Sequence, residues 1–146
     1  MRKYLGGIGA LAGVLFLLAS AQTAVAASPH FIGTPQATVS GNSLTVTFKA
    51  AGLGNVETAD FTLSGTVDVF SRCYNRGGNK PQADNKQETI NVNSTETFPV
   101  SNGQTTGSFT VTPLSTLTCP GNQRVVIESV DFSDLVLSGQ GLTFEF

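Results

Sequence analysis

The side chains best suited to contact a ligand lie in one short stretch, residues 73–86, with the sequence CYNRGGNKPQADNK. Its asparagine amides can donate and accept hydrogen bonds, its arginine can pair with an anion, and its tyrosine ring can stack on a sugar or peptide. The chemistry that these residue types offer is noncovalent recognition of a small molecule, a glycan or a peptide. The candidate ligand-binding residues are Tyr74, Asn75, Arg76, Asn79 and Asn85.

The same composition has a structural interpretation. Asparagine caps backbone groups and tolerates left-handed conformations, Gly77 and Gly78 permit positive φ, and Pro81 fixes a further dihedral angle. Residues 75–86 form a predicted loop of about twelve residues, which is longer than most hairpin connections. A loop of one defined shape needs these residue types whether or not it binds a ligand, so both interpretations stay open.

The rest of the chain has to hold this loop in position. Along most of it, apolar and polar residues alternate, and a period of two is typical of strands. The longest alternation covers residues 59–75 and predicts one buried face made of Phe61, Leu63, Val67, Val69 and Cys73. Gly65 interrupts this face, which predicts a bulge that splits the segment into two strands. Phe70 lies on the polar face, where we expect a loop to cover it.

The remaining alternations predict further strands. Residues 36–50 form two strands joined at SGNS, whereas residues 88–100 and 107–113 form a hairpin through the turn SNGQTTG. Residues 124–138 form another long strand, followed by a glycine-bounded turn and the closing LTFEF, where Phe146 is expected in the core. Seven to nine short strands in one domain predict an all-β fold, a single antiparallel immunoglobulin-like β-sandwich. The alternative is a closed barrel.

The amino terminus has the pattern of a secretory signal peptide. Two cations precede an apolar run, and the small-residue sequence AVA follows at residues 24–26. The apolar run is shorter than the roughly 20 residues of a membrane span. We predict cleavage after Ala26, with Ala27 as the alternative site, so that 1–26 is the signal peptide and 27–146 a secreted, extracellular or periplasmic domain without stable membrane insertion. A retained single-pass anchor is the competing interpretation.

The two cysteines of the chain, Cys73 and Cys119, are predicted to form a disulfide, because export places them in an oxidising compartment. Closing a loop of about 46 residues restricts the unfolded chain by roughly 4 kcal/mol in the chain-entropy description. Since Cys73 lies on the predicted inner face, the bond should tie a strand end to the loop after Pro113 and hold residues 73–86 at the rim. Together with the single histidine, His30, these cysteines are too few for a tetrahedral metal site, so we predict neither metal nor cofactor.

The net charge of the predicted mature chain indicates which classes of partner it can bind. After cleavage, six cations face ten carboxylates, a formal charge of −4. Nucleic acid is excluded as a partner, because phosphate binding depends on clustered cations. Four of the six cations fall between Arg72 and Lys86, so the loop is a weakly basic patch that could be either an anion site or simply solvated.

Motifs for catalysis are missing from the sequence, and we predict that the protein is not an enzyme. Neither G-x-S-x-G nor H-E-x-x-H occurs, and His30 precedes the first predicted strand. Asp68 has no predicted carboxylate partner at a fixed distance, as a glycosidase would require. Glu128, Asp131 and Asp134 lack the spacing of a calcium loop and are expected to keep a sheet edge soluble.

The pattern Cys-x-Asn-x-Gly-Gly-Asn-x-Pro, which spans residues 73–81, is followed by Asn85 and later by Gly-Ser-Phe-Thr-Val and Cys-Pro. Over roughly residues 60–135 the chain thereby resembles a group of small secreted bacterial proteins of unassigned function. The resemblance implies export, a disulfide and a β-sandwich, and carries over no catalytic residues. In size and layout the chain is also similar to the antitumour-antibiotic apoproteins, although it has one cysteine pair where they have two.

Three functions remain open from the sequence. The first is a secreted, non-catalytic structural or interaction module whose partner is an extracellular protein or glycan. The second is a small-molecule or glycan-binding module that uses the loop 75–86, which requires a partly apolar pocket beside that loop. The third is a secreted enzyme inhibitor, for which a rigid exposed loop would suffice.

Overall fold

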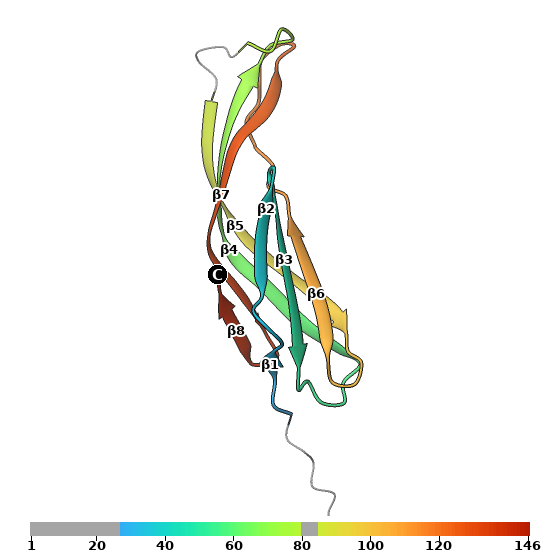
Figure 1. The fold of residues 1–146 in the computed structure, drawn as a ribbon. Helices are drawn as coiled ribbons and strands as arrows, with labels where there is room; N and C mark the ends of the chain where they lie inside the picture. The colour runs from blue at the N-terminus through green and yellow to red at the C-terminus, as the bar shows by residue number, and fades with distance from the viewer. Residues whose placement is uncertain (1–26, 80–84) are drawn as a thin grey trace, which may run out of the picture.

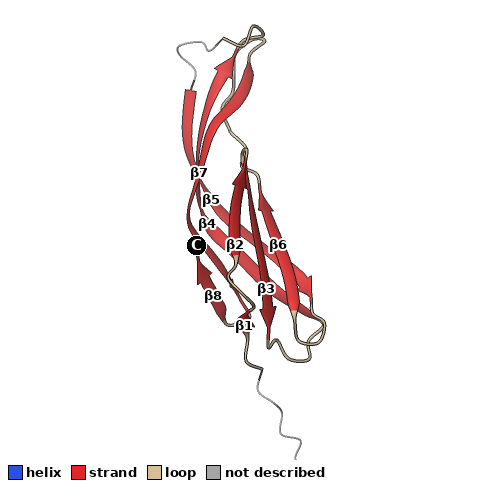
Figure 2. Cartoon of the chain, viewed as in Figure 1, coloured by secondary structure: helices blue, strands red, loops and turns tan. Residues whose placement is uncertain are grey.

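The computed structural model describes residues 27–79 and 85–146, so the predicted signal peptide, 1–26, lies outside the described residues. The described chain is built from strands and loops (Figures 1 and 2). Within these ranges no helix is long and apolar enough to cross a membrane. The strands are β1 (His30–Phe31), β2 (Gln36–Ser40), β3 (Ser43–Ala51), β4 (Thr58–Tyr74), β5 (Asn85–Pro99), β6 (Thr105–Val111), β7 (Arg124–Gly139) and β8 (Leu142–Glu145).

The strands form two antiparallel sheets, in agreement with the predicted all-β class, and the sheets do not close into a barrel. In the short sheet, β1, β2 and β6 all pair with β3. In the long sheet, the order is β5-β4-β7-β8. The predicted pair of strands joined at SGNS is confirmed by the β2–β3 register, in which Ser40 pairs with Ser43. Strands β7 and β8 also form a hairpin, in which Gly139 pairs with Leu142.

The core lies between the two sheets, and alternation explains which residues enter it. The five residues predicted to share the inner face of β4 are all buried. Phe48 of β3 is the centre of the aromatic packing, because its ring lies 4.5 Å from Phe61 of the opposite sheet and 5.4 Å from Phe98. The ring occupies the space over Gly107, where an added Cβ would lie 2.3 Å from it.

The predicted hairpin between residues 88–100 and 107–113 was wrong. β5 pairs with β4 in the long sheet, whereas β6 pairs with β3 in the short sheet. The chain changes sheets at the tight turn where Ser101 and Gln104 exchange backbone hydrogen bonds of 2.9 and 3.0 Å. An alternating pattern shows that each segment has one buried face, but it does not specify which strand lies beside it.

Gly65 lies at a bulge, as predicted, but the bulge does not divide the strand. The register between β4 and β7 shifts between Ser64 and Thr66, while β4 continues to Tyr74. Gly65 has a φ of 155°, and an added Cβ would lie 2.9 Å from the Leu135 side chain. Glycine is therefore required because the neighbouring strand β7 approaches the backbone closely.

Two predictions about the ends of the domain were wrong. His30 does not precede the first strand, because it belongs to β1 and pairs with Ala51. Phe146 follows β8 and is 41% exposed, so it is not a core residue. Its ring packs on Phe144 at 5.0 Å, and its backbone N–H donates a hydrogen bond to the Leu135 carbonyl.

Candidate functional site

The loop selected from the sequence lies at the end of a projection. Figure 1 shows β4, β5 and β7 continuing past the ends of the short sheet, so that three strands of the long sheet extend beyond the two-layered body. The turn 75–79 is at the far end of this projection, and the amino-terminal end of the described chain is at the opposite end of the molecule. We call these extended parts of β4, β5 and β7, with the turn, the projection.

A segment without regular structure takes the place of the missing second sheet. Residues 112–120, which we call the strap, follow β6 and run along the projection before β7 begins (Figure 1). The disulfide between Cys73, on the inner face of β4, and Cys119 holds the end of the strap, and Pro113 is buried at its start. The prediction that this bond ties a strand end to the loop after Pro113 is confirmed.

A carboxylate holds the middle of the strap. Glu88 of β5 points to the inner face, where its Oε2 accepts hydrogen bonds from the Ser115 hydroxyl at 3.1 Å and from the Thr116 N–H at 2.9 Å. The Thr116 hydroxyl donates to Oε1, which also lies 3.1 Å from the Lys86 ammonium. The side chain of Glu88 is 11% exposed. A charge at an inward-facing position therefore fixes the strap to β5.

These hydrogen bonds favour the ionised carboxyl. The hydroxyl and the backbone N–H of Thr116 lower the pKa of Glu88 from its ordinary value of 4.5 to about 2, Lys86 and Ser115 lower it further, and partial burial opposes them. Because the folded-state pKa is below the unfolded one, Glu88 stabilises the folded protein above pH 4.5, and this contribution is lost as the pH falls toward about 2.

We therefore expect a Glu88→Gln variant to be less stable than wild type at neutral pH, with a difference that shrinks between pH 4.5 and about 2. Urea unfolding of both proteins at pH 7, 4 and 2.5 measures this difference. Glu96→Gln, at an exposed glutamate of the same strand, is the matched control. A difference between Glu88→Gln and wild type that stays constant with pH would contradict this role of the charge.

Another cluster occupies the outer face of the projection. The Tyr74 hydroxyl donates to Oε1 of Glu128 at 2.5 Å, and Nε of Arg72 lies 2.9 Å from Oε2 of the same carboxylate. The Arg72 guanidinium also lies over the Phe70 ring, 4.9 Å from its centre. Phe70 is thus covered by an arginine, not by a loop as predicted, and a cation over an aromatic face is a favourable contact.

The turn itself is held by Asn75. Its side-chain Oδ1 accepts a hydrogen bond from the Asn79 N–H at 3.0 Å, and its backbone bonds to Asn79 and Gly78. Gly78 has a φ of 76°, a left-handed conformation that glycine adopts without strain. The structural interpretation therefore applies to Asn75, whereas Arg76 is exposed in the turn. We call the turn 75–79, with the adjoining Tyr74 and Arg124, the tip.

The five predicted ligand-binding residues are brought to one end of the molecule but do not form one pocket. Asn75, Arg76 and Asn79 belong to the turn, and Tyr74 lies on the outer face of the long sheet. Asn85 lies in β5 opposite Arg72, on the same outer face as Tyr74. The predicted loop of about twelve residues is shorter than expected, since residues 85 and 86 belong to β5, and residues 80–84 lie outside the described part of the chain.

A groove lies at the base of the projection instead of beside the turn. Its volume is about 590 Å³, and none of the five predicted residues lines it. Its apolar wall includes Ile90, Val111 and Leu114, and its polar rim includes Asn91 and Asn93. The groove opens where the strap leaves the end of β6.

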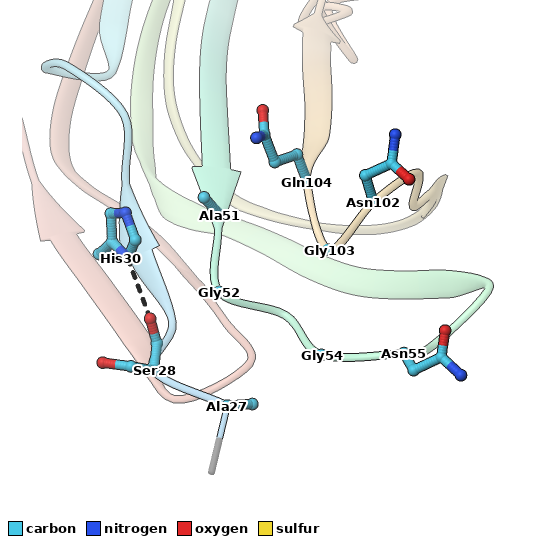
Figure 3. Close-up of a pocket in the computed structure, with 10 residues that line it drawn as sticks. All are labelled: Ala27, Ser28, His30, Ala51, Gly52, Gly54, Asn55, Asn102, Gly103 and Gln104. Carbon is cyan, nitrogen blue, oxygen red and sulfur yellow. Dashed lines mark hydrogen bonds between the residues drawn. The ribbon is translucent and has the colours of Figure 1, made fainter. Parts of the chain in front are cut away.

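A second hollow, of about 520 Å³, lies at the amino-terminal end of the domain (Figure 3). His30 donates a hydrogen bond from Nδ1 to the Ser28 carbonyl at 2.9 Å. In Figure 3, the side chains of Asn55, Asn102 and Gln104 point in different directions. This hollow therefore lacks the converging polar groups that orient a ligand.

The acidic residues do not form a metal centre among the residues the structure describes. Asp68 and Asp131 lie directly opposite each other on β4 and β7, so the prediction that Asp68 has no carboxylate partner at a fixed position was wrong. Both are exposed on the outer face, and Thr89 donates its hydroxyl proton to Asp68. Glu128, which was grouped with Asp131 and Asp134, is instead bound by Tyr74 and Arg72.

Comparison with protein-family models, with curated proteins and with solved structures finds no match to this chain.

Proposed function

We propose that the chain is a secreted, non-catalytic structural or interaction module. In this proposal the two-sheet body is the support and the projection is the part that contacts another extracellular molecule. The long sheet has the strand order β5-β4-β7-β8, and in the short sheet β1, β2 and β6 pair with β3. This arrangement of two antiparallel sheets supports assigning the body to the immunoglobulin-like sandwiches. The disulfide supports export to an oxidising compartment.

One observation carries the proposal: the projection is cross-linked by a disulfide and by the contacts of Glu88 although it lies outside the main core. The three strands of the projection have no second sheet over their ends, and the strap that replaces it is held by the disulfide and by Glu88. Immobilising a loop before binding lowers the entropic cost of association. A projection fixed by covalent and ionic contacts is therefore suited to present its turn to a partner.

The chemistry of the tip indicates the kind of partner. Arg76 is exposed in the turn, and Arg124 lies opposite Tyr74 on the outer face, so cations and an aromatic ring are combined there. The partner that fits is an extracellular protein or glycan with an anionic or hydroxyl-rich surface, because arginine and tyrosine can hydrogen-bond and stack on such groups. The tip is too small a cation cluster to bind nucleic acid.

The groove at the base of the projection favours a second function, binding of a small molecule or glycan. Its apolar wall and its asparagine rim have the composition of a ligand pocket. In this case the ligand contacts Ile90, Asn91 and Asn93, and the turn takes no part in binding.

A comparison of two alanine variants tests the tip. We expect Asn75→Ala to lower the melting temperature, because it removes a hydrogen bond that closes the turn, and Arg76→Ala to leave it unchanged. A glycan microarray and a set of extracellular proteins are probed with both variants and with wild type. Arg76→Ala should lose most of the wild-type signal.

Asn91→Ala in the groove is the matched control for this comparison. If the bound partner is lost with Asn91→Ala and retained with Arg76→Ala, the groove is the binding site and the proposal for the tip is wrong. If neither variant changes the signal, both sites are excluded.

A further inference from the structure

Strand β2 is an open edge of the short sheet. Within the described chain it pairs with β3 alone, through the register Gln36–Thr47 to Ser40–Ser43, and all five of its residues are exposed. The side of β2 away from β3 presents backbone N–H and C=O groups to which another strand can bond. Such an edge is a site for strand addition.

The other long edges carry features that prevent strand addition. In β5, Lys86, Glu88 and Glu96 occupy inward-facing positions, opposite Ser71, Val69 and Phe61. β7 has two register shifts, and β8 has four residues, of which one is a glutamate. Inward charges, bulges and short length are the features that discourage edge pairing. β2 contains no charged residue, no proline and no bulge.

The edge strand β6 also lacks charge, but it has less exposed apolar surface to cover, since Val111 at its end is the one inward side chain that is only partly buried. Its inward side chains Thr105 and Phe109 are buried already. By contrast, the inward positions of β2 are Ala37 and Val39, opposite the core residues Val46 and Leu44, and Val39 is 52% exposed. A strand added at β2 would therefore remove more apolar surface from water than one added at β6.

The distribution of charge indicates that a second copy of the chain can approach this edge. Every carboxylate in the described ranges belongs to the long sheet or its adjoining turns, from Glu57 to Glu96 and from Glu128 to Glu145. The short sheet has none, and its one lysine is Lys49. Two copies of an acidic protein meet the least repulsion where neither presents a carboxylate.

We propose that two copies of the chain pair through β2 in antiparallel orientation, about a two-fold axis at Thr38. This register uses all five residues, and it places Ala37 opposite Val39 of the second copy and Gln36 opposite Ser40. The short sheets then join into one continuous sheet across both copies. The interface is small and polar apart from Ala37 and Val39, so the association is reversible and depends on concentration. The proposal goes beyond the function assigned to the tip and does not depend on it.

Sedimentation equilibrium of the purified mature domain tests the association. We expect the average mass to rise from one chain toward two with increasing concentration. Thr38→Lys would place two lysines directly opposite each other across the interface, and like charges at such a position are unfavourable, so we expect association to weaken about ten-fold. Ser108→Lys adds the same charge to the same face on β6 and should associate as wild type does. Monomers at every concentration, or masses beyond two chains, would overturn the proposal.

A covalent trap tests the register. Residues directly opposite in an antiparallel pair have Cα atoms about 4.5–5.5 Å apart, a distance that a disulfide spans. Thr38→Cys should therefore form a covalent dimer under mild oxidation much faster than Ser108→Cys, which serves as the control for random collision. Equal rates for the two variants would show that β2 does not meet its counterpart at Thr38. Because both side chains are exposed, neither variant is expected to disturb folding.

Discussion

Replacing Phe48 with alanine is expected to lower the free energy of unfolding by about 3–5 kcal/mol. The ring is buried and lies between the two sheets, in contact with Phe61 of the long sheet and with Phe98 and Phe109. Removing it takes away buried apolar area and leaves a cavity over Gly107, a position without a side chain that could move in to fill it.

Urea unfolding followed by circular dichroism measures this loss. Phe146→Ala is the matched control, because the same atoms are removed from a ring that is 41% exposed. The control should cost less than about 1.5 kcal/mol, as a half-exposed side chain loses little burial. If the two variants were equally destabilised, Phe48 would not be the centre of the core.

Removing the disulfide by replacing Cys73 and Cys119 with alanine is expected to cost about 2–4 kcal/mol. The bond closes a loop with a sequence separation of 46 residues, and it also holds the strap where no second sheet covers the projection. Alanine is preferred to serine, because the neighbouring Ser71 hydroxyl is already buried without a hydrogen-bond partner among the described residues. A further buried hydroxyl would add its own penalty.

The effect of this double substitution should differ between regions. We expect amide hydrogen exchange to accelerate most in β5 near Glu88 and in the strap, and least in β3, which lies within the main core. Wild type with its disulfide reduced is the control and should behave like the variant. A loss below about 1 kcal/mol, with unchanged exchange in the strap, would show that Glu88 alone holds the projection.

The alternation of apolar and polar residues predicted the fold class, because the apolar residues of β4 are the ones that face the core. Phe61, Leu63 and Val69 are buried as the pattern required, and Cys73 continues the row to its disulfide. The partners of the strands could not be predicted in the same way. β5 and β6 would show the same alternation whether they formed a hairpin or lay in different sheets. β6 lies beside β3 because Phe48 fits closely over Gly107, and neither segment alone shows this contact in its sequence.

The candidate site was only partly predictable. Glycine and asparagine in residues 73–79 indicated a defined turn, and Asn75 closes it. Glu88 was missed, although a charge at an inward-facing position of a strand is a usable signal that the position is occupied by a specific contact. Its partner Thr116 could not have been found, because nothing in the sequence shows that the strap passes β5. The same holds for Glu128, which reaches Tyr74 and Arg72 only through the β4–β7 register.

The amino-terminal end of the described chain and the turn 75–79 lie at opposite ends of the molecule, and this separation has a practical consequence. A purification tag or fluorophore attached ahead of Ala27 sits as far from Arg76 as the domain allows. Immobilising the protein on a sensor through that end leaves the turn facing the solution. A carboxy-terminal attachment after Phe146 would instead lie midway along the domain, where it could obstruct a partner.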